Sequence, residues 1–147
     1  MIRFPQNFEL KFEITERCNS RCSFCHQGYG KLLSWKEIKF SQVERWLRWA
    51  CEQGITAIRF TGGEPLLHPQ LKKMAEFASR QGFYVTVNSN GLISEKRYDV
   101  LSPFIDMYKI SLPAADEDTV DRLTGVKGAF RKKIVSIQHL NEHPRQP

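Results

Sequence analysis

The chain has 147 residues, of which 41% are hydrophobic and 26% charged, and this composition indicates a soluble globular protein rather than a disordered or membrane-bound one. No apolar run approaches the roughly 18–20 residues of a transmembrane helix, and the opening MIRFPQNFEL lacks the apolar core of a secretory signal, so a cytoplasmic location is expected. The net charge of +6 is modest, and its densest patch, residues 131–133, is interpreted as a solvated helix face rather than a nucleic-acid site.

The first predicted element is a strand over residues 8–15, because the apolar side chains of FELKFEIT alternate with polar ones. Alternating or β-branched stretches bounded by turn residues predict three further strands, over residues 56–63, 83–91 and 106–112.

Helices are predicted where apolar residues recur at helical spacing, over residues 41–54, 68–82, 94–103 and 128–143, with a short helical turn over 116–123. Ser41 is the expected N-cap of the first helix, and Trp46 and Cys51 are expected in its buried stripe. In the second helix, Pro69 suits the first turn, and the predicted buried stripe consists of Leu71, Met74, Ala75 and Ala78. This alternation of strands and helices indicates an α/β protein with a parallel sheet.

Four unusual local sequences lie at, or just after, the carboxyl ends of the predicted strands. They are CNSRCSFC (18–25), GGEP (62–65), NSNG (88–91) and SLPAAD (111–116). In such proteins the loops after the carboxyl ends of parallel strands share one edge of the sheet and carry the working residues. The four sequences are therefore expected to form one site.

Cys18, Cys22 and Cys25 lie within eight residues of each other. In a reducing compartment, clustered cysteines are more often metal ligands or catalysts than disulfides. A closed zinc site takes four ligands, and His26, a candidate for the fourth, directly adjoins Cys25. A redox dithiol would use a C-x2-C pair alone. An iron–sulfur cube with one iron left open agrees best with three thiols, although the spacing leaves zinc and dithiol chemistry open.

The motif C-x3-C-x2-C, with Phe24 before its last cysteine, resembles the cluster-binding loop of the radical S-adenosylmethionine (radical SAM) enzymes. TGGEP, residues 61–65, is similar to the second signature of that family. NSNGL and KISLPAADEDTVDRLTGVKGAF resemble the regions after strands three and four in its molybdenum-cofactor-biosynthesis and peptide-maturase branches. The resemblance extends from about residue 10 to about residue 140.

The resemblance implies that Cys18, Cys22 and Cys25 bind a [4Fe–4S] cluster and that S-adenosylmethionine (SAM) binds its fourth iron. It implies an enzyme that cleaves SAM reductively to a 5′-deoxyadenosyl radical, which abstracts hydrogen from a peptide or a small organic molecule. The electron would come from a flavodoxin-like or ferredoxin-like donor. The implied SAM-binding residues are Phe24, Gly62, Gly63, Glu64, Pro65, Asn90, Ser111 and Arg122.

Each implied contact has a physical reason. Glycines at 62 and 63 would let the backbone approach a ligand closely, and Glu64 would accept hydrogen bonds from the ammonium of SAM. Ser111 and Asn90 would bind the ribose or the carboxylate, Arg122 would pair with the carboxylate, and Phe24 would lie near the adenine.

Two features depart from the family pattern. Pro113 stands where the related branches commonly carry an aspartate, which removes a carboxylate and a backbone donor. The family core has six strand–helix units, whereas this chain supplies four. The expected fold is therefore a partial parallel (β/α) barrel, in a single truncated core domain over residues 1–147.

Several partners and functions remain open at this point. A missing C-terminal half, self-association or another subunit would complete the barrel. A non-catalytic half-barrel scaffold is the alternative function. Neither a membrane nor a nucleic acid is an expected partner.

Overall fold

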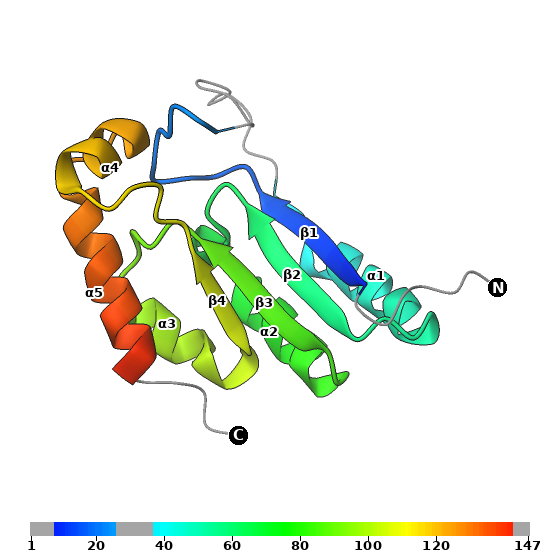
Figure 1. Cartoon of the computed structure of the whole chain (residues 1–147). Coiled ribbons are helices and arrows are strands. Elements are labelled where there is room, and N and C mark those ends of the chain that lie inside the picture. Colours follow the sequence, from blue (N-terminus) through cyan, green and yellow to red (C-terminus); the bar gives the residue numbers. More distant parts are fainter. Residues whose placement is uncertain (1–7, 26–36, 143–147) are drawn as a thin grey trace.

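The computed structural model describes residues 8–25 and 37–142, and a parallel sheet forms its centre (Figure 1). The sheet has four strands in the order β1-β2-β3-β4, with every neighbouring pair parallel. The strands are β1 (Glu9–Thr15), β2 (Ala57–Gly62), β3 (Tyr84–Ser89) and β4 (Met107–Ile110). The predicted α/β class and the four predicted strands are confirmed.

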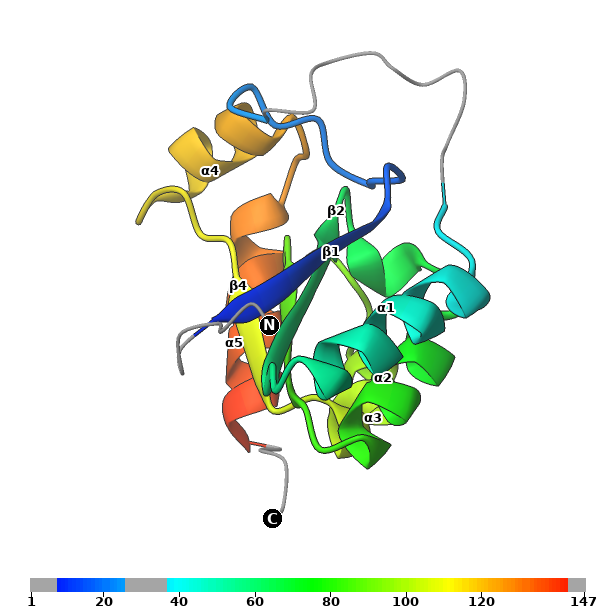
Figure 2. The same cartoon turned by 90° about the vertical axis from the view of Figure 1, so that its right-hand side faces the viewer.

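Three helices cover one face of this sheet, as Figure 2 shows from the side. They are α1 (Phe40–Glu52), α2 (Leu71–Arg80) and α3 (Glu95–Leu101). The remaining helices, α4 (Glu117–Thr124) and α5 (Ala129–Glu142), follow β4, and α5 contacts α3. No helix in the described part of the chain is long and apolar enough to cross a bilayer.

The core lies between the sheet and α1, α2 and α3. Each strand sends alternate side chains into it, because successive residues of a strand face opposite sides. In β1, Phe12 and Ile14 are buried while Lys11 and Glu13 are exposed and form an ion pair at 3.1 Å on the other face. The predicted alternation of residues 8–15 is therefore confirmed.

Helix α1 differs from its prediction in its first residue and in its buried side. The N–H of Phe40 donates to Oε1 of Gln70 (2.9 Å), so the helix begins before Ser41, which is not its N-cap. Trp46 is 50% exposed and Cys51 is also exposed, so the prediction that both are core residues is wrong. The residues of α1 that face the sheet are Val43, Leu47 and Ala50.

Helix α2 begins later than predicted. A 3-10 turn, Pro65–Leu67, follows β2 and occupies the chain that leads toward the helix, so α2 starts at Leu71 and Pro69 precedes its first turn. The predicted stripe of α2 is nevertheless fully buried, and it consists of Leu71, Met74, Ala75 and Ala78.

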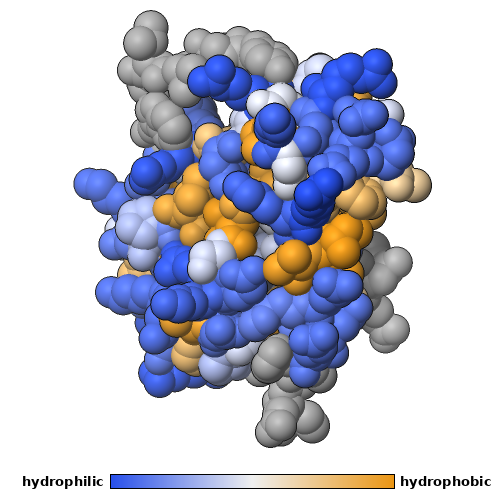
Figure 3. Space-filling view, turned by 90° about the vertical axis from the view of Figure 1, so that its left-hand side faces the viewer, coloured by the Kyte–Doolittle hydropathy of each residue, from blue (hydrophilic) through white to orange (hydrophobic). Residues whose placement is uncertain are grey.

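The side of the molecule formed by β4, α4 and α5 has a mixed surface. Figure 3 shows separate apolar areas there within a hydrophilic surround. Val135 on α5 and Met107 on β4 are among the exposed apolar side chains, at 46% and 41%. Since β4 is also an edge strand, this side of the sheet has an open hydrogen-bonding edge among the described residues.

Candidate functional site

The loop that leaves β2 lies directly against the start of the cysteine loop, which we define as residues 16–25. The N–H of Gly63 donates to the carbonyl of Thr15 (2.7 Å), and the N–H of Glu64 donates to that of Arg17 (2.7 Å). These bonds continue the β1–β2 pairing beyond the end of β1. GGEP therefore determines where the cysteine loop leaves the sheet.

The two glycines of GGEP make this approach sterically allowed. A Cβ on Gly62 would lie 2.2 Å from the carbonyl oxygen of Thr15, and one on Gly63 would lie 2.4 Å from that of Arg17. Gly62 also has a φ of +135°, a conformation that residues with a Cβ rarely adopt. The groups in close contact with these glycines are thus the end of β1, for Gly62, and the start of the cysteine loop, for Gly63.

Glu64 is fully buried and joins the loops after β2 and β3. Its Oε2 accepts hydrogen bonds from the N–H of Asn90 (2.7 Å) and the hydroxyl of Ser89 (3.2 Å), and its Oε1 accepts one from the N–H of Leu66 (3.1 Å). Burial raises the pKa of Glu64 from 4.5 to about 7, against the opposing effect of these hydrogen bonds and of the Lys133 ammonium. The structure thus gives this carboxyl three donors from its own chain.

The raised pKa of Glu64 predicts a pH-dependent stability. Between pH 4.5 and 7 the folded chain retains the Glu64 proton that the unfolded chain has lost, so stability falls as the pH rises through this window. The quantity to compare is the unfolding free energy of the metal-free wild type minus that of Glu64→Gln. We expect this difference to fall by roughly 2–3 kcal/mol between pH 5 and pH 8. Urea unfolding at both pH values checks this, and a constant difference would contradict it.

Asn90 joins the loop after β3 to the cysteine loop. Its Nδ2 donates to Oδ1 of Asn19 (2.7 Å) and to Sγ of Cys18 (3.6 Å), while its Oδ1 accepts from the N–H of Leu92 (2.8 Å). Burial raises the pKa of the Cys18 thiol, and hydrogen bonds from Ser20 and Asn90 oppose that rise. The side-chain amide nitrogen of Asn90 therefore bonds the cysteine loop, while its oxygen bonds the loop after β3.

The other side of the cysteine loop rests on the carboxyl end of α4. The N–H of Arg21 donates to the carbonyl of Thr124 (2.9 Å), and the N–H of Ser23 donates to that of Leu123 (2.9 Å). The last carbonyls of a helix lack intrahelical partners, so they can accept these bonds. α4 ends there because Gly125 takes the left-handed conformation (φ 65°). Sequence reasoning missed this contact, and Gly125 was its only local signal.

The three thiols lie on this supported loop. Cys18 and Cys22 are half-buried and Cys25 is exposed, with its N–H donating to the carbonyl of Cys22 (3.1 Å). Within residues 8–25 and 37–142, no three His, Cys, Asp or Glu side chains converge closely enough to hold a metal ion. The donor set itself fits an iron–sulfur cluster, since thiolates are its usual protein ligands and this loop presents three at or near the surface.

One residue expected on a solvated helix face is buried. Lys133 of α5 is only 1% exposed, and its Nζ donates to the carbonyls of Ser111 (2.8 Å) and Asn90. The prediction holds for Arg131 and Lys132, which are exposed, and it is wrong for Lys133.

The sequence contained a signal for this burial. Lys133 lies four residues after Ala129 and three before Ser136, and both of these are buried. This i, i+4, i+7 spacing places all three on one face of α5. A prediction by charge alone overlooks it.

The other predicted site residues differ in their surroundings. Pro65 is buried at the start of its 3-10 turn. Phe24 is 56% exposed, and Ser111 and Arg122 are also exposed. His26 lies outside the described residues. Hydrogen bonds thus join Glu64, Asn90 and Cys18, whereas Phe24, Ser111 and Arg122 lie at the surface.

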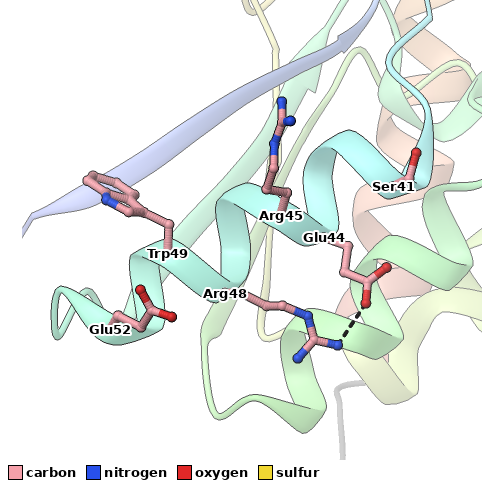
Figure 4. Close-up of a pocket in the computed structure, with 6 residues that line it drawn as sticks. All are labelled: Ser41, Glu44, Arg45, Arg48, Trp49 and Glu52. Carbon is pink, nitrogen blue, oxygen red and sulfur yellow. Dashed lines mark hydrogen bonds and ion pairs between the residues drawn. The ribbon is translucent and has the colours of Figure 1, made fainter.

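A surface hollow of about 400 Å³ lies away from these loops, along α1 (Figure 4). Its lining includes the ion pair between Arg48 and Glu44 (2.8 Å) and the side chain of Trp49. None of the predicted site residues lines it.

Comparison with known proteins gives one family. The radical SAM superfamily profile matches residues 12–144. The probable GTP 3′,8-cyclase of Thermoplasma volcanium is 32% identical over 138 residues, and that of Methanocella arvoryzae is 32% identical over 129. These alignments cover 90% and 87% of this chain but only 41% of each relative, so the chain spans less than half the length of either.

Solved structures agree on the fold. Streptococcus suis SuiB bound to S-adenosylmethionine matches with a TM-score of 0.81 at 22% identity, covering 97% of this chain and 33% of SuiB. The radical SAM neighbours have a partial TIM-barrel fold, and the four parallel strands described above correspond to part of it.

Proposed function

Because the chain belongs to the radical SAM superfamily, an enzyme family that uses a [4Fe–4S] cluster and SAM, we propose that its cysteine loop binds such a cluster and that the neighbouring loops bind SAM. Cys18, Cys22 and Cys25 would hold three irons, and SAM would take the fourth. A bound cluster would supply the electron for reductive cleavage of SAM, and the chemistry that follows would be hydrogen abstraction from the substrate.

The residues of this chain contribute position rather than redox chemistry. The carboxyl of Glu64 accepts a hydrogen bond from the N–H of Asn90, and the side chain of Asn90 donates one to the sulfur of Cys18. Hydrogen bonds to cluster sulfurs are among the factors that set the reduction potential. The exposed side chains of Phe24, Ser111 and Arg122 remain our candidates for the adenine, the ribose and the carboxylate of SAM.

One observation carries the proposal. The cysteine loop is held on both sides by backbone hydrogen bonds, from GGEP on one side and to the last carbonyls of α4 on the other. Segments about 50 and 100 residues away along the chain thus converge on a loop of three thiols. A loop that merely follows a strand would not need hydrogen bonds from two distant segments to fix its backbone.

The substrate is proposed to be a peptide or a small organic molecule. The curated relatives are named probable GTP 3′,8-cyclases, and one SuiB structure is described as bound to the precursor peptide SuiA. A flavodoxin-like or ferredoxin-like protein would donate the electron.

The proposal predicts a defined spectroscopic result. We expect this chain, reconstituted anaerobically with iron and sulfide and then reduced, to give the electron paramagnetic resonance signal of a [4Fe–4S] cluster. Adding SAM should change that signal, because SAM would bind the iron that lacks a cysteine. A colourless protein, a protein that holds zinc, or a cluster signal indifferent to SAM would contradict the proposal.

A further inference from the structure

The buried Lys133 of α5 connects the carboxyl ends of β3 and β4. Its Nζ donates to the carbonyl of Asn90, just beyond β3, and to that of Ser111 (2.8 Å), the first residue after β4. Both carbonyls lie past the end of the ladder between the two strands, whose last pair is Ser89 with Ile110. The ammonium therefore joins the loops after β3 and β4 just beyond the last backbone pair of these two strands. Both loops belong to the proposed SAM site.

The stem of Lys133 is seated against the turn after β3. Gly91 has a φ of +75°, and a Cβ there would lie 3.2 Å from Cγ of Lys133. One helical turn further along α5, the hydroxyl of Ser136 donates to the carbonyl of Gly91 (3.0 Å). The turn Asn90–Gly91 and the buried face of α5 are thus fitted to each other, so the lysine side chain is held in one place.

A charged side chain in this position needs a reason beyond packing. Burying an ammonium is costly unless it is paired, and an apolar side chain would fill the same space at lower cost. Burial lowers the pKa of Lys133, while the negative charges of Cys22, Glu64 and Cys18 act to raise it. Asn90 links the ammonium to two of these groups: its carbonyl accepts from Lys133, its N–H donates to Oε2 of Glu64 (2.7 Å), and its Nδ2 donates to Sγ of Cys18 (3.6 Å).

We propose that Lys133 is a positioning residue of this site, which fixes the loops after β3 and β4 and balances the negative charge of Glu64 and of a cluster-bound thiolate of Cys18. The part that concerns the thiolate rests on the proposed function, since it needs a bound cluster. The part that concerns Glu64 does not depend on any metal. The two parts therefore call for separate measurements.

The first measurement is a double-mutant cycle in the metal-free chain, with Lys133→Met, Glu64→Gln and the double variant. At pH 8.5 the Glu64 carboxyl, with a pKa of about 7, is ionised in the folded wild type. Charge balance predicts that the double variant loses less stability in urea than the sum of the single losses, because the second change removes the charge left unpaired by the first. Lys132→Met, an exposed neighbour, should leave the urea midpoint unchanged.

If the stability loss of the double variant equals the sum of the losses of Lys133→Met and Glu64→Gln, Lys133 does not balance the charge of Glu64. If Lys133→Met does not fold, a folded double variant supports the proposal and an unfolded one overturns it. A role confined to the two carbonyl hydrogen bonds would give no such rescue, because Glu64→Gln does not replace them.

The second measurement is the reduction potential of the reconstituted cluster in wild type, Lys133→Met and Lys132→Met. A buried positive charge nearby favours the reduced cluster, so Lys133→Met should shift the potential to more negative values while Lys132→Met does not. An unchanged potential in a Lys133→Met protein with full iron content would overturn the thiolate part of the proposal. A wild type that assembles no cluster would overturn that part together with the proposed function, whereas the double-mutant cycle would still decide the Glu64 part.

Discussion

Cys18→Ala, Cys22→Ala and Cys25→Ala should each lower the iron affinity of the chain at least about tenfold. Loss of a residue that only supports a metal ligand already lowers metal affinity by about this factor, and loss of a ligand itself should cost at least as much. Each thiol is one of the three expected ligands, so each variant removes one of the proposed bonds to iron. Iron and sulfide content after anaerobic reconstitution measures the effect. The same iron content in all three variants and the wild type would refute the metal assignment.

Cys51→Ala is the matched control for these variants. Cys51 is an exposed cysteine near the end of α1, immediately before the chain that leads into β2. It therefore lies at the opposite end of the strands from the cysteine loop. The variant should retain the full iron content, and because Cys51 is not in the core, it should also unfold at the wild-type urea concentration.

Gly62→Ala should destabilise the protein by about 2–5 kcal/mol, because it combines an unfavourable backbone conformation with overpacking. The new Cβ would meet the carbonyl oxygen of Thr15 at 2.2 Å, and the backbone φ of +135° adds strain. Relief of this contact would require the end of β1, and the cysteine loop that follows it, to move away from β2. Urea unfolding measures the loss, and the iron content of the folded fraction shows whether the loop has moved.

Two further glycine variants separate the causes. Gly63→Ala has the steric conflict without the positive φ, since its Cβ would lie 2.4 Å from the carbonyl oxygen of Arg17. Gly82→Ala has the positive φ (+83°) with nothing within 4 Å of the new Cβ. We expect about 1–3 kcal/mol for the first and about 1–2 kcal/mol for the second, with lost iron binding only at Gly63. A Gly63→Ala protein as stable as wild type would show that GGEP does not hold the cysteine loop as described.

The stretches whose structure was predicted correctly are those with a strong local signal. Alternating apolar residues were enough for β1, since a strand with one face on the core must alternate. The buried stripe of α2 followed from its spacing, and the four strand ends carry the four unusual sequences as expected. The family resemblance, carried by three cysteines and GGEP, is confirmed by the match over residues 12–144.

The errors share a physical cause. In α1, apolar residues flank the stripe on both sides, and only the packing against the sheet decides that Leu47 is buried and Trp46 is not. At the start of the same helix, Gln70, which is distant in sequence, accepts the N–H of Phe40. Neither contact can be predicted from local spacing.

The sequence by itself determined the fold class, the order of the elements and the placement of the cysteine motif at the carboxyl ends of the strands. Periodicity and motif spacing are local properties of a chain, so they can be recognised without the tertiary structure. Only the tertiary structure decided which groups support that motif. The carboxyl end of α4 beneath residues 21–23, the buried Glu64 and the buried Lys133 each depend on contacts between distant segments. The burial of a charge follows from what the fold packs around it, and so the charge arrangement of the site became visible only in three dimensions.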